Sequence, residues 1–208
     1  MMSAGSTVVG TSTPFEERWG GWYVTGQHGG GRHRGNAVAH EDEGNWYLDP
    51  EPGANISSLA PFFNVGPYPR KTSDIVALMV LEHQSSVQNT LTKAAHATLR
   101  AMHMQRWLQE ELGEPVLDEP TGTAKRIVDH AAEDVVEALL YYEEAALPEG
   151  GIEGDPAFQD AFSASAPRSS TGKSLKDFQL LNRLFKYRCS YMVYSITFEH
   201  LPAELKSV

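Results

Sequence analysis

Side chains that could bind a metal or a cofactor are concentrated in a glycine-rich stretch near the N-terminus. His28 and His33 are separated by four residues, and seven of the 18 residues from Trp19 to Asn36 are glycine. A neutral imidazole can ligate zinc, copper or haem iron. The glycines would let the backbone approach a bulky ligand closely. The stretch therefore predicts a ligand site.

Charged and aromatic residues flank these two histidines. Arg32 and Arg34 could pair with carboxylates such as haem propionates. Trp22 and Tyr23 could line an apolar pocket. The alternative interpretation is a glycine-turned structural loop with exposed histidines. The stretch matches neither a standard zinc motif nor a phosphate-binding loop, because the HExxH, Cys/His and GxxxxGK patterns are all absent.

His83 is the third candidate ligand. It falls on the apolar stripe of a predicted helix, between Val80 and Val87. A histidine on this stripe loses hydration and needs a partner, which could come from the glycine-rich stretch. A satisfied core histidine is the alternative. The candidate cofactor-binding residues are His28, His33, Arg32, Arg34, His83, Trp22 and Tyr23, of which the three histidines are the candidate metal ligands; the catalytic residues are unknown.

Helices must position these side chains. Residues 73–112 contain no Pro or Gly and repeat apolar residues at helical spacing, so they predict one helix of about 40 residues or two helices with a kink. Ser73 is the expected N-cap. A second helix is predicted over 123–147. A third is predicted to start at Ser174, where Asp177 completes a Ser-x-x-Asp pattern.

The resulting fold class is mainly α: a helical bundle with a long central helix and an irregular Gly/aromatic-rich N-terminal segment. Residues 1–72 form this segment, packed on the bundle of residues 73–208, in which 148–172 is predicted to be a mobile loop. One domain is expected. The helix predicted after Pro202 is barely two turns long, which leads us to expect a chain truncated at both ends.

Composition excludes several function classes. The net charge of -10 argues against nucleic acid as a partner. The longest apolar run, 75–81, is too short for a transmembrane segment, and residues 1–14 do not have the pattern of a signal peptide. The single cysteine, Cys189, excludes an intrachain disulfide and a CxxCH haem-attachment motif within this chain. A nucleophilic role for Cys189 would require neighbouring cations to lower its pKa.

Three stretches, "PFEERWGGWYVTGQHGGGRHRGN", "SDIVALMVLEHQ" and "RLFKYRCSYMVYSITFEHLP", resemble a group of bacterial exported proteins labelled as cytochrome c domain-containing. In that group an upstream segment carries a signal peptide and CxxCH. The resemblance implies a periplasmic or exported protein. It also implies haem c as the cofactor if a missing upstream haem segment supplies CxxCH, since none is attachable to this chain alone. That segment or a redox partner would be the partner.

Two functions are therefore expected, and the sequence leaves both open. The first is the C-terminal part of a c-type haem-containing redox or electron-transfer protein, in which His28, His33 or His83 would shape the haem environment. The alternative is a non-enzymatic helical interaction module with no cofactor, since the chain contains no identifiable nucleophile and base pair.

Overall fold

The computed structural model describes residues 8–18 and 22–208. Trp19 and two glycines of the glycine-rich stretch lie outside the described residues. The fold is mainly α, with 42% of the chain in helices and one small two-stranded sheet. Contacts divide the chain into two compact units. Unit 1 comprises residues 1–83 and 143–187, and unit 2 comprises residues 84–142 and 188–208.

The long central helix is confirmed. α1 runs without a break over Ile75–Leu112, so the kinked alternative does not occur. Its first turn is capped by Asp74 rather than by Ser73, because the Asp74 carboxylate accepts a hydrogen bond from the Ala77 backbone N–H at 2.8 Å. Gly113, with a φ of 68°, follows its last residue, as expected for a helix C-terminus.

The second helix, α2, covers Gly122–Leu139 and ends eight residues earlier than predicted. Tyr141 takes a left-handed conformation with a φ of 56°, and the Tyr142 N–H donates to the Glu137 carbonyl. This is a Schellman-type end, which does not need a glycine when a buried side chain holds the left-handed residue. Tyr141 is only 3% exposed.

The helix predicted from Ser174 was wrong. The cap itself forms, since Asp177 accepts a hydrogen bond from the Ser174 N–H. The chain then reverses: Leu180 has a φ of 57°, and Phe178 pairs with Phe185 in an antiparallel bridge. The Gln179 amide oxygen accepts three backbone N–H bonds across this turn. A side chain that replaces the backbone acceptors in this way prevents the turn at Ser174 from continuing as a helix.

The remaining elements are short. In unit 1 they are η1 (Phe15–Glu17), η2 (Arg34–Asn36), β1 (Val38–Asp42), β2 (Asn45–Asp49) and α3 (Pro156–Ala164). In unit 2 they are η3 (Tyr191–Tyr194), α4 (Ile196–Glu199) and α5 (Ala203–Lys206). α3 lies in the stretch 148–172 that was predicted as a loop. The helix predicted after Pro202 is confirmed as α5.

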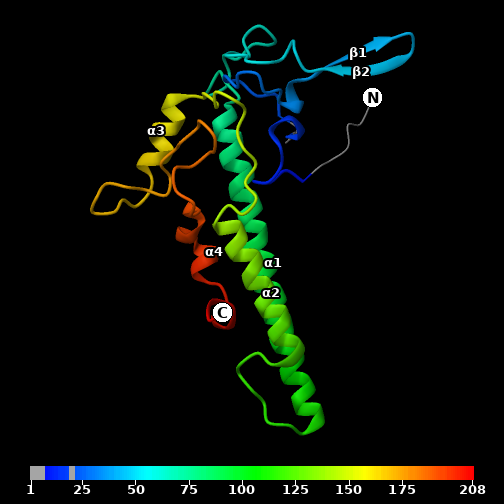
Figure 1. The fold of residues 1–208 in the computed structure, drawn as a ribbon, viewed down its shortest axis with the longest axis vertical. Helices are drawn as coiled ribbons and strands as arrows, with labels where there is room; N and C mark the ends of the chain where they lie inside the picture. The colour runs from blue at the N-terminus through cyan, green and yellow to red at the C-terminus, as the bar shows by residue number, and fades with distance from the viewer. Residues whose placement is uncertain (1–7, 19–21) are drawn as a thin grey trace. The chain divides into compact units, whose positions relative to one another are not determined.

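β1 and β2 form an antiparallel hairpin in unit 1, in the register Val38 with Asp49 and Asp42 with Asn45 (Figure 1). The two residues of its turn, Glu43 and Gly44, both have positive φ angles, which is the type I′ geometry.

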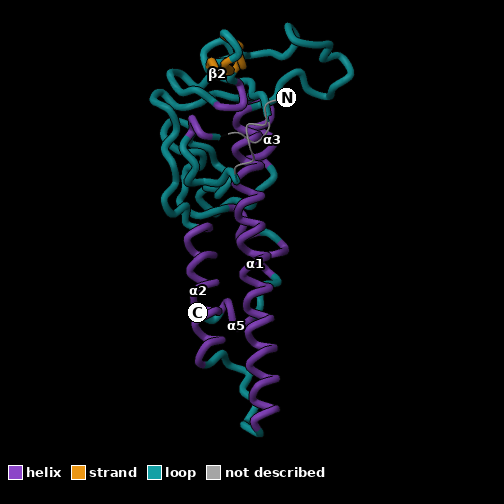
Figure 2. The backbone as a smooth tube through the Cα atoms, turned by 90° about the vertical axis from the view of Figure 1, so that its right-hand side faces the viewer, coloured by secondary structure: helices purple, strands orange, loops and turns teal. Residues whose placement is uncertain are grey.

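In unit 2, the part of α1 from residue 84 onward and α2 run side by side as a helical hairpin (Figure 2). Gln105 and Gln109 fix the connection between the helices. The Gln105 amide accepts from the Thr121 N–H and donates to the Glu119 carbonyl, while Gln109 accepts from the Leu117 N–H. α5 contacts α2, and Leu201 and Leu205 are buried, so the C-terminal segment covers part of this hairpin.

Candidate functional site

His28 is part of the backbone framework of unit 1. Its Nδ1 lies 2.8 Å from the Gly31 carbonyl oxygen, and its Nε2 accepts a hydrogen bond from the Asn55 N–H at 3.2 Å. This pairing requires the neutral ring with the proton on Nδ1. The Asn55 side chain returns two bonds, accepting from the His28 N–H and donating to the Gly29 carbonyl. Burial lowers the pKa of His28, which favours this neutral form.

His33 lies close to His28 in the same buried region. The Phe15 ring packs on both, with centroid distances of 5.5 Å to His28 and 5.8 Å to His33. His33 Nδ1 accepts from the Gly35 N–H at 3.2 Å and so caps η2. Burial is the main cause that lowers the pKa of His33 to about 4, and electrostatic interactions with His28 and Arg18 contribute to the same shift. His33 is therefore neutral at pH 7.

The glycines of this stretch serve close packing of the backbone. A Cβ at Gly35 would lie 2.1 Å from the Trp22 carbonyl oxygen, and a Cβ at Gly53 would lie 2.0 Å from the Asn36 carbonyl oxygen. Asn36, 1% exposed, joins these segments: it accepts from the Val24 N–H and donates to the carbonyls of Val24 and Gly53. Hydrogen bonds of the Asn36 side chain therefore hold the predicted ligand loop against the segment around Gly53.

The other predicted residues of the stretch face outward or make local contacts. Arg32 forms a two-pronged ion pair with Glu51, at 2.9 and 2.7 Å, on the exposed surface. Arg34 is exposed, and Trp22 is 50% exposed. The Tyr23 ring meets Phe62 edge to face at 5.4 Å. Within the described residues, the hydrogen bonds of Arg32 and the ring contact of Tyr23 go to groups other than the three histidines.

His83 lies beside a buried ion pair. Its Nδ1 is 3.3 Å from the Thr11 hydroxyl, and its ring packs on Phe185 at 5.8 Å. The preceding residue, Glu82, accepts from Arg18 at 2.8 Å, and Arg18 also donates to the Thr11 carbonyl. Burial lowers the pKa of His83 to about 4. Burial raises the pKa of Glu82, although Arg18 opposes this effect.

Whether these histidines can ligate haem iron or another metal ion depends on which ring nitrogens already bind the protein. A ligating histidine must offer one ring nitrogen to the ion. His28 does not fit, because both its ring nitrogens are hydrogen-bonded to the protein. His33 and His83 each use Nδ1 within the protein. Among residues 8–18 and 22–208, no group of three or more His, Cys, Asp or Glu side chains could hold a metal ion.

Unit 2 carries a groove along the seam between α1 and α2 that the sequence reasoning did not identify. It has two sections, of about 340 and 290 Å³, which share Thr123 and Ile127. Its α1 side runs from Lys93 to Gln109, and its α2 side from Thr121 to Asp134. The apolar lining consists of Ala94, Ala97, Ala101, Met104 and Leu108 from α1 and Ala124, Ile127 and Ala131 from α2.

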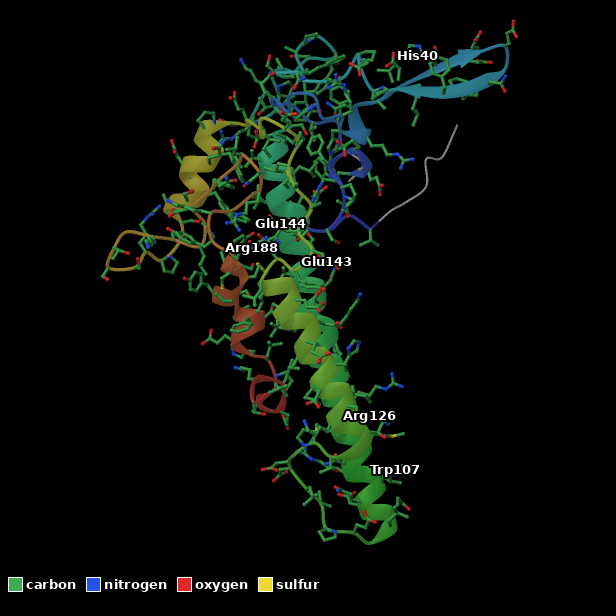
Figure 3. All side chains as sticks on the ribbon, viewed as in Figure 1. His40, Trp107, Arg126, Glu143, Glu144 and Arg188 are labelled. Carbon is green, nitrogen blue, oxygen red and sulfur yellow. The ribbon has the colours of Figure 1, made fainter. Side chains whose placement is uncertain are left out.

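This lining combines small buried residues with large exposed ones. Ala94 and Ala131 are 4% and 6% exposed and form the floor, whereas Met104 and Leu108 are 60% and 49% exposed and form a wall. None of residues 188–208, the segment that covers another part of the hairpin, contributes to it. Trp107, near the connecting loop in Figure 3, adds a further exposed ring on α1.

Comparison with known proteins gives no relative. No protein-family model matches the chain, and neither curated proteins nor solved structures contain a significant match. None of the described helices combines the length and apolar character needed to cross a bilayer. Cys189 is half-buried, and burial raises its pKa, opposite to the shift that a nucleophilic thiol requires.

The sequence reasoning missed the residues that organise unit 1: Arg18, Asn36, Asn55 and Glu82. Their partners are 12 to 64 positions away in the chain, so no local pattern marks them. The groove did have a signal. Alanines at 94, 97, 101, 124 and 131 recur at helical spacing on both helices, which lets a neighbouring helix approach closely.

Proposed function

We propose that the chain is a non-enzymatic helical interaction module that binds a helix of a partner protein in the groove between α1 and α2. The bound partner helix would pack against α1 and α2 and complete a three-helix bundle, in keeping with the helical bundle that the sequence predicts. The groove carries this proposal, because an apolar channel with a small-residue floor is the shape that accepts an amphipathic helix.

The dimensions suit one helix. The α1 side spans 16 residue steps from Lys93 to Gln109, or about 24 Å at 1.5 Å per residue. A partner segment of four to five turns would contact the whole length. Large exposed apolar side chains at the wall of a concave surface are also typical of protein interfaces rather than of an ordinary solvated surface.

A labelled 18-residue amphipathic helix with a Leu/Ala stripe and glutamine flanks tests this function by fluorescence anisotropy. Ile127→Asp, which places a charge in the shared part of the groove, is expected to weaken binding at least tenfold. Val136→Asp is the matched control, since Val136 is also exposed on α2, at 52% against 40% for Ile127, but does not line the groove. Equal affinity for both variants, or no binding by the unmodified chain, would refute the proposal.

The redox function implied by the resemblance is a separate proposal and rests on that resemblance together with the burial of His33 and His83. Haem c would come from an upstream segment, and residues of unit 1 would contribute only its surroundings. Expression with such a segment and haem maturation should give a Soret band. If that band is unchanged in His33→Ala and His83→Ala variants, these histidines do not act on the haem.

A further inference from the structure

α1 has an uneven charge distribution along its length. Between Glu82 and Glu110 the helix contains no acidic residue, whereas Lys93, Arg100 and Arg106 are all basic. This is unusual in a chain with a net charge of -10. Lys93, Ala97 and Met104 line the groove. Arg100 is not a lining residue, but it falls on the same helix face, three residues after Ala97 and four before Met104. One rim of the groove is therefore basic.

Two cations of α1 beside the groove, Lys93 and Arg100, form no ion pair with an acidic residue in the described part of the chain. Arg106, by contrast, pairs with Asp118 at 3.3 Å. The α2 rim adds Arg126, whose side chain donates a long hydrogen bond of 3.4 Å to the Thr123 hydroxyl. Asp134 is the one acid in this section of the lining. Figure 3 labels Arg126 on α2.

We propose that the groove selects a partner helix whose apolar stripe is flanked by carboxylates. The inference rests on the proposed function and names the chemistry of its partner. Carboxylates placed along the stripe would reach Lys93 and Arg100 on one rim and Arg126 on the other, while the stripe contacts the alanine floor. Glutamate at i and i+4 or i+7 of the partner matches the helical spacing of these cations.

The net charge of the chain does not oppose this choice. At 0.15 M salt the Debye length is about 8 Å, so acidic residues elsewhere on the molecule are largely screened from a helix in the groove. The rim cations lie within direct contact distance of a bound helix and are screened much less. The cations beside the groove, rather than the net charge of the chain, therefore decide which partner helix binds more tightly.

Three peptides test the inference: 18-residue helices with the same Leu/Ala stripe and with flanks of glutamate, glutamine or lysine. We expect the glutamate peptide to bind about fivefold tighter than the glutamine peptide at 50 mM NaCl, the lysine peptide to bind weakest, and the differences to shrink at 500 mM NaCl. The double variant Lys93→Glu/Arg126→Glu should reverse the order.

Lys71→Glu/Lys173→Glu is the control for that reversal. Both residues are exposed in unit 1, and the double change alters the net charge equally. Equal affinity for the three peptides would overturn the inference while leaving the proposed function intact. Failure of all three to bind would overturn both. A chain that is dimeric in sedimentation, and monomeric as Ile127→Asp, would show that a second copy fills the groove and would also overturn the inference.

Discussion

The two units of this chain differ in where their histidines and charged residues lie. Unit 1 buries them: Arg18, His28, His33, Glu82 and His83 are each at most 8% exposed, and backbone and side-chain hydrogen bonds tie them together. Unit 2 buries alanine, valine and leucine and leaves its four histidines exposed, at positions 96, 103, 130 and 200. Clustered histidines and charged residues can therefore stabilise the fold of an irregular segment without forming a ligand site.

That lesson follows from the lack of regular structure in unit 1. Outside α1, α3 and the hairpin, the described backbone of unit 1 pairs through isolated bridges and turns, so some buried N–H and C=O groups take side-chain partners instead. Asn36, Asn55 and His28 supply them. The helical hairpin of unit 2 satisfies its own backbone, which leaves its side chains available for a partner.

The largest expected difference between the units is their response to acid. His33 and His83 have pKa values lowered from 6.5 to about 4. Such groups stabilise the fold fully above pH 6.5, and this stability is lost as the pH falls towards 4. The loss is at most roughly 3 kcal/mol for each histidine. Burial raises the pKa of Glu82, so its contribution changes in the opposite direction and offsets part of the loss.

Hydrogen exchange at pH 7 and pH 4.5 measures this response in each unit. Unit 1 should lose protection by at least a hundredfold, after correction for the intrinsic pH dependence of exchange, and α2 should change little. An equal loss of protection in both units would contradict the claim that the buried histidines make unit 1 more sensitive to acid.

Breaking the Arg18–Glu82 pair should have the next largest effect. Arg18→Ala leaves a buried carboxylate without its cation and should lower the free energy of unfolding by about 3–5 kcal/mol. The double variant Arg18→Met/Glu82→Leu should recover most of the loss, because neither charge is then buried alone. Urea denaturation measures both. A double variant as unstable as the single one would indicate that the pair has a role beyond mutual neutralisation.

Asn36→Ala should cost on the order of 3 kcal/mol, because it leaves the backbone groups of Val24 and Gly53 without partners in the interior. Asn45→Ala, at an exposed position of the hairpin in the same unit, should cost less than about 0.5 kcal/mol and serves as the control. Similar losses for both variants would show that the Asn36 bonds do not hold the glycine-rich segments together.

The sequence predicted the parts of this molecule that depend on local pattern. α1, α5 and the apolar stripe of α2 follow from the spacing and helix propensity of their residues. The predicted helix at Ser174 failed because Gln179 takes over the backbone N–H groups five residues after the cap. The hairpin of β1 and β2 was missed because Glu43-Gly44 is not one of the Asn-Gly or Asp-Gly pairs that mark a type I′ turn. Arg18 and Glu82 are 64 positions apart, and no spacing rule relates such residues.

The most direct test of the account is a map of where an amphipathic helix binds. In ¹H–¹⁵N NMR spectra, addition of the glutamate-flanked peptide should shift the amide signals of Ala97, Ala101, Ile127 and their groove neighbours and leave those of His28 and His33 unchanged. Shifts centred on His28 and His33, with none along the groove, would contradict the account and return the binding function to the glycine-rich stretch.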